Sequence, residues 1–221
     1  MTLGSQMKIA FYGGSFDPVH HGHLAVAKSL TSQFELDEFV FIPAFHAPHK
    51  KRLASTPALD RYAMLCLATN NEPTTSVSKI EIEVPSKPYT VETLTRLTEL
   101  LPDAELFFVM GADSWRDIRT WREWETVLTI TNHIVVTRPG YEIGLDHVTE
   151  EIGERIIDLR GLVNSTPTAN PAFNHIYFTD TVNLDVSASD IRKKIRENDD
   201  DRYNDVTTEV AKYIEKYQIY S

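Results

Sequence analysis

The chain has 221 residues, a formal net charge of −10 at pH 7, 42% hydrophobic residues and one cysteine. This size and composition are typical of a globular protein with one core, and the negative charge argues against nucleic acid as a partner. One cysteine leaves no intrachain disulfide and favours a cytoplasmic location, while no apolar run reaches the ~18 residues of a membrane helix, so no membrane partner is expected.

The first half of the chain alternates apolar runs with helical patterns. Residues 7–14, MKIAFYGG, predict a buried strand that ends in paired glycines. Asp17 and Pro18 then predict a helix start, with Asp17 as the cap and the proline tolerated in the first turn. Residues 38–43, EFVFIP, predict a second buried strand, and another helix is expected to begin at Thr56.

The middle of the chain continues this alternation. Residues 76–84, SVSKIEIEV, alternate polar and apolar side chains, which predicts a half-exposed strand. Residues 91–101 predict a helix, and residues 105–111 and 133–140 each predict a buried strand that ends in glycine.

The last third of the chain is less regular. Within 141–174 only a short helix over EEIGERIIDL is expected, and the rest receives no structure. Residues 175–180 predict the last strand, and 187–198 and 207–220 predict helices separated by an acidic, solvated loop. Strands that alternate with helices predict an α/β fold with a mainly parallel sheet, in which ligands bind beyond the carboxyl ends of the strands.

A stretch rich in glycine and histidine follows the first predicted strand. Residues 11–30 read FYGGSFDPVHHGHLAVAKSL. The glycines let backbone amides approach a ligand closely, and the next helix directs its positive N-terminal end at the same space, so the stretch predicts an anion site, most naturally for phosphate. His20 and His23 are three residues apart and share a helix face, where two imidazoles can donate hydrogen bonds to phosphate oxygens.

Other kinds of site are compatible with parts of this stretch. Two histidines at this spacing could bind zinc, but neither Cys66 nor a nearby motif clearly supplies a third ligand. The chain contains no GxxxxGK[ST] phosphate loop. It contains no GxGxxG fingerprint either, so a nicotinamide-dependent dehydrogenase loses its main support.

Residues 13–24, GGSFDPVHHGHL, resemble the signature GG(S/T)FDPxHxGHL of the nucleotidylyltransferase superfamily, and in particular of bacterial nicotinate-nucleotide adenylyltransferases. Similar segments extend over nearly the whole chain; they are Pro43 with PHK at 48–50, YTVETL at 89–94, GADS at 111–114 with Trp121, RPG at 138–140 and VSASDIR at 186–192. The last of them departs from the family's ISSTxIR at Ala188 and Ser189, which puts a hydroxyl contact to phosphate in doubt.

This resemblance implies a fold and a reaction. The fold would be Rossmann-like and doubly wound, a single domain over 1–221 with the late helical region, about 187–221, packed on it. The phosphate of nicotinate mononucleotide would attack the α-phosphate of ATP, giving deamido-NAD and pyrophosphate, with Mg²⁺ bridging the phosphates. ATP and nicotinate mononucleotide are therefore the expected partners, and a homo-oligomer is left open.

The resemblance also implies the site residues. Catalytic roles fall on His20, His23, Lys50 and Arg192. The expected ATP-binding residues are Gly13, Gly14, Ser15, Phe16, His20, His23, Gly111, Asp113, Ser187, Ser189 and Arg192. The expected mononucleotide-binding residues are His49, Lys50, Tyr89, Thr90, Trp121 and Arg138. No protein metal site is expected.

Several of these residues also have a purely structural interpretation. Trp121 could belong to a buried helical stripe with Trp115 and Ile118. Tyr89 and Thr90 could form an ordinary helix cap, and Lys50 could belong to a solvated basic turn.

Other functions stay open at this point. An adenylyltransferase for nicotinamide mononucleotide or for phosphopantetheine would use the same chemistry, although the latter enzymes are generally shorter and carry Thr at the position of His20. A class I aminoacyl-tRNA synthetase fragment shares the HxGH pattern, but the chain has no KMSKS-like loop. A non-catalytic nucleotide sensor on this scaffold would bind ATP without turnover.

Overall fold

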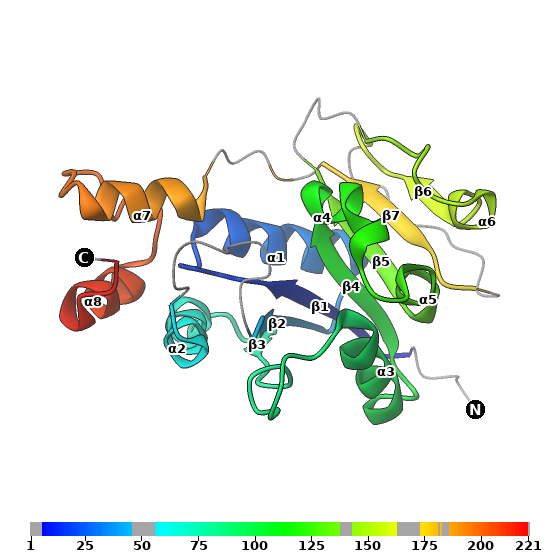
Figure 1. The fold of residues 1–221 in the computed structure, drawn as a ribbon, viewed down its shortest axis with the longest axis horizontal. Coiled ribbons are helices and arrows are strands. Elements are labelled where there is room, and N and C mark those ends of the chain that lie inside the picture. Colours follow the sequence, from blue (N-terminus) through cyan, green and yellow to red (C-terminus); the bar gives the residue numbers. More distant parts are fainter. Residues whose placement is uncertain are drawn as a thin grey trace.

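A seven-stranded parallel sheet forms the centre of the molecule (Figure 1). The computed structural model describes residues 6–45, 56–137, 143–162, 173–180, 182 and 186–220. The strand order is β3-β2-β1-β4-β5-β7-β6, and every pairing is parallel. The strands are β1 (Lys8–Gly14), β2 (Glu38–Pro43), β3 (Thr75–Val77), β4 (Glu105–Gly111), β5 (Asn132–Val136), β6 (Ile156–Asp158) and β7 (Ile176–Thr179).

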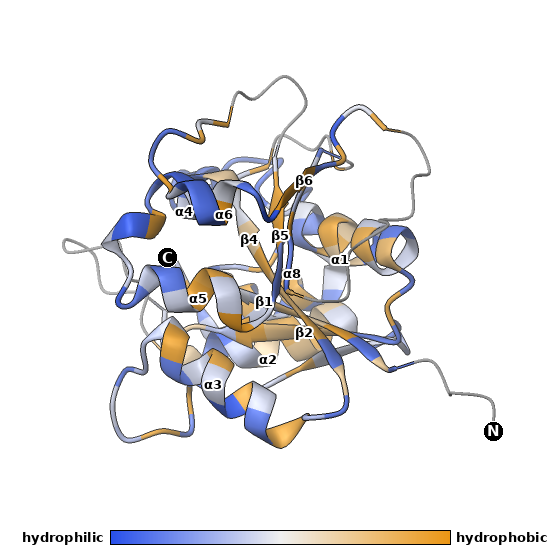
Figure 2. Ribbon diagram, turned by 90° about the vertical axis from the view of Figure 1, so that its right-hand side faces the viewer, coloured by the Kyte–Doolittle hydropathy of each residue, from blue (hydrophilic) through white to orange (hydrophobic). Residues whose placement is uncertain are grey.

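Helices cover both faces of this sheet because its strands are apolar on both sides. In β1, Ala10 packs in one core cluster, whereas Ile9 and Phe11 pack in the other, as the two-residue period of a strand requires. The first cluster includes residues of α1 (His21–Phe34), α2 (Ala58–Thr69), α7 (Ala188–Arg196) and α8 (Thr208–Tyr217). The second includes residues of α3 (Thr90–Leu100), α4 (Ala112–Arg116), the 3₁₀ helix η1 (Ile118–Thr120), α5 (Trp124–Ile130) and α6 (Glu150–Gly153). Figure 2 shows the largely hydrophobic strands β4 and β5 between α1 and α5.

The order of the strands creates one crevice for a ligand. The chain runs outward from β1 to β2 and β3, then crosses to β4 on the other side of β1. In sheets of this kind the connections after the two central strands diverge, and ligands bind where they part. The carboxyl ends of β1 and β4, at Gly14 and Gly111, therefore frame the expected site.

The predicted α/β fold with a parallel sheet is confirmed, and the strands expected at 7–14, 38–43 and 105–111 are present. The helix start is different. Helix α1 begins at His21, with His20 as the N-cap residue, and not at Asp17 and Pro18, which are joined by a cis peptide bond. Asp17 does not cap this helix because its carboxylate is buried and accepts a hydrogen bond from Tyr220, far along the chain.

The prediction of a strand over 76–84 is wrong for most of these residues. Strand β3 ends at Val77, and the amide of Ser78 still reaches the carbonyl of Phe41 at 2.8 Å. Beyond it the amides of Ile82 and Glu83 donate to the carbonyl of Lys79, so the segment turns away from the sheet. Its alternating pattern reflects Ile80 packing against the core from a loop.

The region 143–162 holds a strand that the pattern missed. The helix expected over EEIGERIIDL covers only α6, and Ile156–Asp158 form β6, which pairs with β7 at the sheet edge. Strand β7 is the last in the chain, as expected, but lies between β5 and β6. The strand expected over 133–140 is present as Asn132–Val136, and residues 138–140 lie outside the described part. The two late helices are present, and the acidic tract between them is largely exposed.

No helix among the described residues is long and apolar enough to span a bilayer.

His133 gives the fold a pH dependence that can be measured. Its ring is fully buried in β5 beside Phe108, and its Nδ1 lies 3.0 Å from the carbonyl oxygen of Thr131. Nε2 has no hydrogen-bond partner among the described residues. Burial lowers the pKa of His133 from its ordinary 6.5 to about 4.

Between these two pH values the unfolded histidine binds a proton that the folded one does not, so the free energy of unfolding falls as pH falls. We expect His133→Leu to flatten this slope by up to about 1.4 kcal/mol per pH unit, the value for one proton. Urea unfolding of both proteins at pH 4.5 to 7 measures the difference. Equal slopes would mean that His133 is not held neutral by burial.

Candidate active site

The turn after β1 is shaped by glycine and an aromatic ring. A Cβ at Gly14 would lie 2.8 Å from the ring of Phe16, so no larger residue fits without moving that ring. Phe16 has a left-handed backbone (φ 46°) and is 2% exposed. Its ring packs edge-on against His23, with 4.9 Å between ring centroids. The side chain of Phe16 therefore packs against His23 and lines neither of the two cavities described below.

His20 and His23 form a stacked pair at the start of α1. Their ring centroids are 3.7 Å apart with an interplanar angle of 29°. The backbone amide of His20 donates to Nδ1 of His23 at 3.2 Å. A neutral His23 must therefore carry its proton on Nε2, which is free to donate to a ligand.

Both rings are uncharged at neutral pH. Burial lowers the pKa of His20 to about 4, against an opposing effect of Asp205. Burial, with a smaller effect of His20, lowers the pKa of His23 well below its ordinary value. Nδ1 of His20 is buried and has no partner among the described residues. The pair offers hydrogen bonds to an anion without presenting two full positive charges.

The two histidines line a cavity of about 580 Å³, here called the histidine cavity. Its walls come from β1, α1, β4, α4 and β5 and from the segment before α7; they are Tyr12, His20, Gly22, His23, Val26, Gly111, Ala112, Asp113, Val136, Thr137, Val182 and Val186. The fold thus brings together four residues expected to bind ATP, namely His20, His23, Gly111 and Asp113. Asp113 forms an exposed ion pair with Arg116 at 3.1 Å.

The start of α7 lies against the same turn. Ser187 is the N-cap of this helix: its Oγ accepts from the amide of Asp190 at 3.1 Å and donates to the Asp190 carboxylate at 2.8 Å. Arg192 donates one hydrogen bond to Ser189 Oγ at 3.2 Å and another to the carbonyl of Asp17. Arg192 is therefore positioned beside the glycine turn, whereas the hydroxyl of Ser187 is occupied by its own helix.

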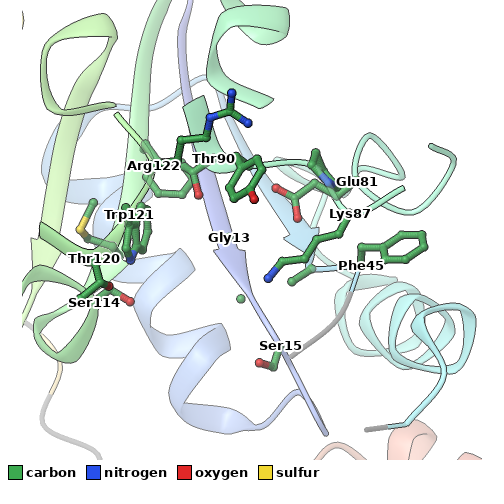
Figure 3. A pocket seen from close by; sticks show the side chains of 16 residues that line it. Gly13, Ser15, Phe45, Glu81, Lys87, Thr90, Ser114, Thr120, Trp121 and Arg122 are labelled. Carbon is green, nitrogen blue, oxygen red and sulfur yellow. The ribbon is translucent and has the colours of Figure 1, made fainter. Parts of the chain in front are cut away.

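A second cavity, of about 380 Å³, opens on the other side of β1 and is here called the tryptophan cavity (Figure 3). Three residues expected to bind the mononucleotide line it, namely Tyr89, Thr90 and Trp121. Gly13, Gly14 and Ser15, which were expected to bind ATP, also line this cavity and not the histidine cavity. The other lining residues are Ala44, Phe45, Glu81, Lys87, Pro88, Phe108, Met110, Ser114, Thr120 and Arg122. The indole of Trp121 meets Phe108 edge-on, with 6.4 Å between centroids.

Two structural interpretations prove to be compatible with the predicted site. Tyr89 is the N-cap residue of α3, its amide donates to Glu92 at 3.0 Å, and it also lines the tryptophan cavity. Trp115 and Ile118 are buried in the core as the stripe predicts, but Trp121 lies beyond η1 and faces the cavity.

The sequence patterns did not predict that charged residues, namely Glu81, Lys87 and Arg122, line the tryptophan cavity. Glu81 accepts from Thr93 at 3.0 Å, and burial raises the pKa of its carboxyl against the effects of this bond and of Lys87. Figure 3 shows the amino group of Lys87 pointing into the cavity. Arg122 stacks on the ring of Tyr89 at 4.8 Å. Lys87 lies only two residues before the YTVETL motif, which was the one available signal.

Arg61 holds the turn in place and was also missed. Its side chain is 0% exposed and donates to the carbonyls of Thr56 (3.0 Å), Ser15 (2.6 Å) and Ala44. Arg61 thereby joins the start of α2, the turn after β1 and the loop after β2. Arg61 precedes Met64 and Leu65 by three and four residues, so it lies on the same buried face of α2. A charged residue on an otherwise apolar helix face was the available signal in the sequence.

The predicted residues His49, Lys50 and Arg138 lie outside the described part of the chain. Among the residues that the structure describes, no group of three or more His, Cys, Asp or Glu side chains is placed to hold a metal ion.

The two cavities adjoin the same strand ends from opposite faces of the sheet. Tyr12 and Gly13 are neighbours in β1, yet Tyr12 lines the histidine cavity and Gly13 the tryptophan cavity. Met110 and Gly111 of β4 are divided in the same way. A ligand that crosses the carboxyl ends of these strands can place one end in each cavity and its anionic middle at the glycine turn.

Known proteins are similar to this chain over most of its length. Residues 11–194 match the cytidylyltransferase-like family. A probable nicotinate-nucleotide adenylyltransferase of Mycobacterium sp. (strain KMS) is 37% identical over 94% of this chain and 94% of its own length. One from Desulfatibacillum aliphaticivorans is 36% identical over 97% of this chain and 100% of its own length.

The chain belongs to the nicotinate-nucleotide adenylyltransferase family.

A match over nearly the full length of both chains also removes the synthetase-fragment interpretation. Among solved structures, the nicotinic acid mononucleotide adenylyltransferase of Plasmodium falciparum complexed with NaAD aligns with a TM-score of 0.72 over 97% of both chains at 21% identity. At that identity the structural likeness supports the fold alone.

A substitution of Arg61 tests whether its hydrogen bonds hold the turn after β1 in place. We expect Arg61→Lys to lower the free energy of unfolding by about 2–4 kcal/mol, because an ammonium group cannot span three separated carbonyls and leaves buried acceptors unpaired. Urea unfolding measures the loss. Arg196→Lys, on the exposed side of α7, makes the same exchange and should change stability by less than about 0.5 kcal/mol. Equal small effects in both variants would contradict a clamping role for Arg61.

Proposed function

We propose that the chain transfers AMP from ATP to nicotinate mononucleotide, giving deamido-NAD and pyrophosphate. Its family membership supports the reaction class and the substrates. The observation that carries the proposal within this chain is the pair of cavities that meet at the glycine turn, one lined by uncharged histidines and the other by an aromatic and charged set. A mononucleotide and ATP can react only where their phosphates meet. The glycine turn between the two cavities offers such a place.

In the proposed complex ATP occupies the histidine cavity. The adenosine lies near Gly111 and Asp113, and the triphosphate extends toward His20, His23 and the start of α7. The Nε2–H of His23 donates to a phosphate oxygen, since its Nδ1 is occupied by the backbone. Arg192 and Lys50 neutralise further phosphate charge, and Ser187 and Ser189 mark the helix end that faces it.

The mononucleotide occupies the tryptophan cavity. Its pyridine ring stacks on Trp121, its carboxylate is read near Tyr89, Thr90 and Lys87, and its phosphate reaches the amides of Gly13 to Ser15. His49 and Arg138, which lie outside the described residues, are further candidates for binding the mononucleotide. A phosphate oxygen forms a bond to the α-phosphorus of ATP, while the bond from that phosphorus to the β-phosphate oxygen breaks and pyrophosphate leaves.

The residues contribute positioning and charge stabilisation rather than a nucleophile. The histidine pair is pre-oriented by the helix start, so its donors need no rearrangement as charge develops on the transferred phosphate. Mg²⁺ would enter with ATP, held by phosphate oxygens and water, and would neutralise part of the triphosphate charge. A cytoplasmic location fits the single cysteine.

The reaction is tested directly by pyrophosphate release with ATP and Mg²⁺. Nicotinate mononucleotide, nicotinamide mononucleotide and phosphopantetheine are offered separately. The proposal requires strong preference for the nicotinate form. Release with another acceptor alone would overturn the substrate, and ATP binding without release would indicate a nucleotide sensor.

His23 should be needed for turnover. We expect His23→Ala to lower kcat by about 10² to 10³, the scale of losing a key transition-state donor. His21→Ala is the matched control, because His21 is exposed on the same helix turn and lines neither cavity; its kcat should stay near that of the wild type. Near-normal turnover in a folded His23→Ala protein would rule out this role.

Lys87 should distinguish the acid from the amide substrate. We expect Lys87→Gln to raise KM for nicotinate mononucleotide by about 10-fold, the scale of one hydrogen bond to a charged group, and to leave KM for ATP unchanged. KM for nicotinamide mononucleotide is measured in parallel. If both mononucleotides lose affinity equally, Lys87 contacts their common phosphate; if neither does, Lys87 contacts no substrate.

A further inference from the structure

The end of the chain returns to the glycine turn. Tyr220, the last residue that the structure describes, has a left-handed backbone (φ 75°) and follows α8 closely. Its hydroxyl donates to Oδ1 of Asp17 at 2.7 Å, across 203 residues of sequence. Asp17 is 4% exposed and belongs to the segment between Gly14 and His20 that shapes both cavities.

This contact is the one side-chain hydrogen bond that the Asp17 carboxylate accepts within the described residues. Burial, with the charge of Asp17, raises the pKa of Tyr220, so the hydroxyl keeps its proton and acts as a donor. A buried carboxylate that loses a hydrogen-bond donor is destabilised, because its oxygen has given up its bonds to water on burial. The position of Asp17 therefore depends on Tyr220.

The same segment is held at two further points. Arg61 binds the carbonyl of Ser15 from α2, and Arg192 binds the carbonyl of Asp17 from α7. Tyr220 adds the third point and the only one of these that acts on a side chain. Because Arg192 and Tyr220 both hold Asp17, a shift of this residue also moves the guanidinium proposed to bind the triphosphate.

We infer that Tyr220 is a positioning residue for ATP: its hydroxyl fixes Asp17 and, through it, the turn and the arginine that contact the triphosphate. This inference rests on the proposed ATP site. It assigns the end of the chain a part in nucleotide binding, although Tyr220 lines neither cavity.

A second tyrosine in α8 supplies a matched control. The hydroxyl of Tyr213 donates to Oδ1 of Asp60 in α2 at 2.8 Å. The two bonds share their chemistry and nearly their length, and both tie the C-terminal region to the rest of the fold. Only the acceptor of Tyr220 belongs to the turn, so the two Tyr→Phe changes separate positioning from general stability.

The test compares Tyr220→Phe, Tyr213→Phe and the wild type in the full chain. ATP affinity is measured by calorimetry without an acceptor, kcat and KM by pyrophosphate release, and stability by urea unfolding. We expect Tyr220→Phe to weaken ATP binding about 10-fold, the scale of one hydrogen bond to a charged group, and to lower kcat while KM for nicotinate mononucleotide changes little. Tyr213→Phe should leave ATP affinity, kcat and KM near those of the wild type, even where it lowers stability as Tyr220→Phe does.

If Tyr220→Phe binds ATP as tightly as Tyr213→Phe does, the inference is wrong, whatever the acceptor. If Tyr220→Phe cannot be obtained folded, Asp17→Asn and Asp17→Leu take its place, because an amide oxygen still accepts from Tyr220 and an apolar side chain does not. Lower ATP affinity in Asp17→Leu than in Asp17→Asn supports the hydrogen bond, and equal affinities contradict it. ATP binding by the wild type without release from any acceptor would overturn the proposed function and leave the Tyr220 comparison intact.

Discussion

The buried guanidinium of Arg61 is the interaction on which the geometry of the site depends. Removing a guanidinium from water costs several kcal/mol unless its donors are paired. Here the donors are paired with backbone carbonyls of three separate segments, and among the described residues Arg61 forms no ion pair with a carboxylate. Carbonyl groups have fixed positions along the backbone, so these bonds specify the relative placement of the three segments. One side chain thereby sets the shape of the turn between the two cavities.

Around this turn the sheet topology separates the two halves of the site. Adjacent residues of β1 and β4 face opposite cavities, so a single strand end serves both without a change in backbone direction. The aromatic set Tyr12, Phe16 and Phe41 packs beneath the turn and fixes His23 from its apolar side. The same packing covers part of the His23 ring, and burial lowers the pKa of this histidine well below its ordinary value. Structural support and electrostatic tuning of the histidine therefore have one cause.

The sequence predicts the parts of this site that depend on local pattern. The strand, the glycine turn and the start of the histidine helix lie within residues 7–30, and the apolar run and the glycines are sufficient to place the strand and the turn, but not the first residue of the helix. Arg61 and Tyr220 were not predicted because their partners, Ser15 and Asp17, lie 46 and 203 residues away. Local patterns carry no signal for such contacts. Asp17 was misassigned for the same reason, since a distant tyrosine occupies the carboxylate that a local rule would use as a cap.

The hydrogen bond between the His20 amide and Nδ1 of His23 has one more consequence. That nitrogen serves as the acceptor at the start of α1, and it is also the atom that a second proton would occupy. His23 can become an imidazolium only by giving up this bond, which frees the first turn of the helix. The backbone amide of His20 therefore opposes proton transfer to this ring, in addition to the burial that lowers its pKa.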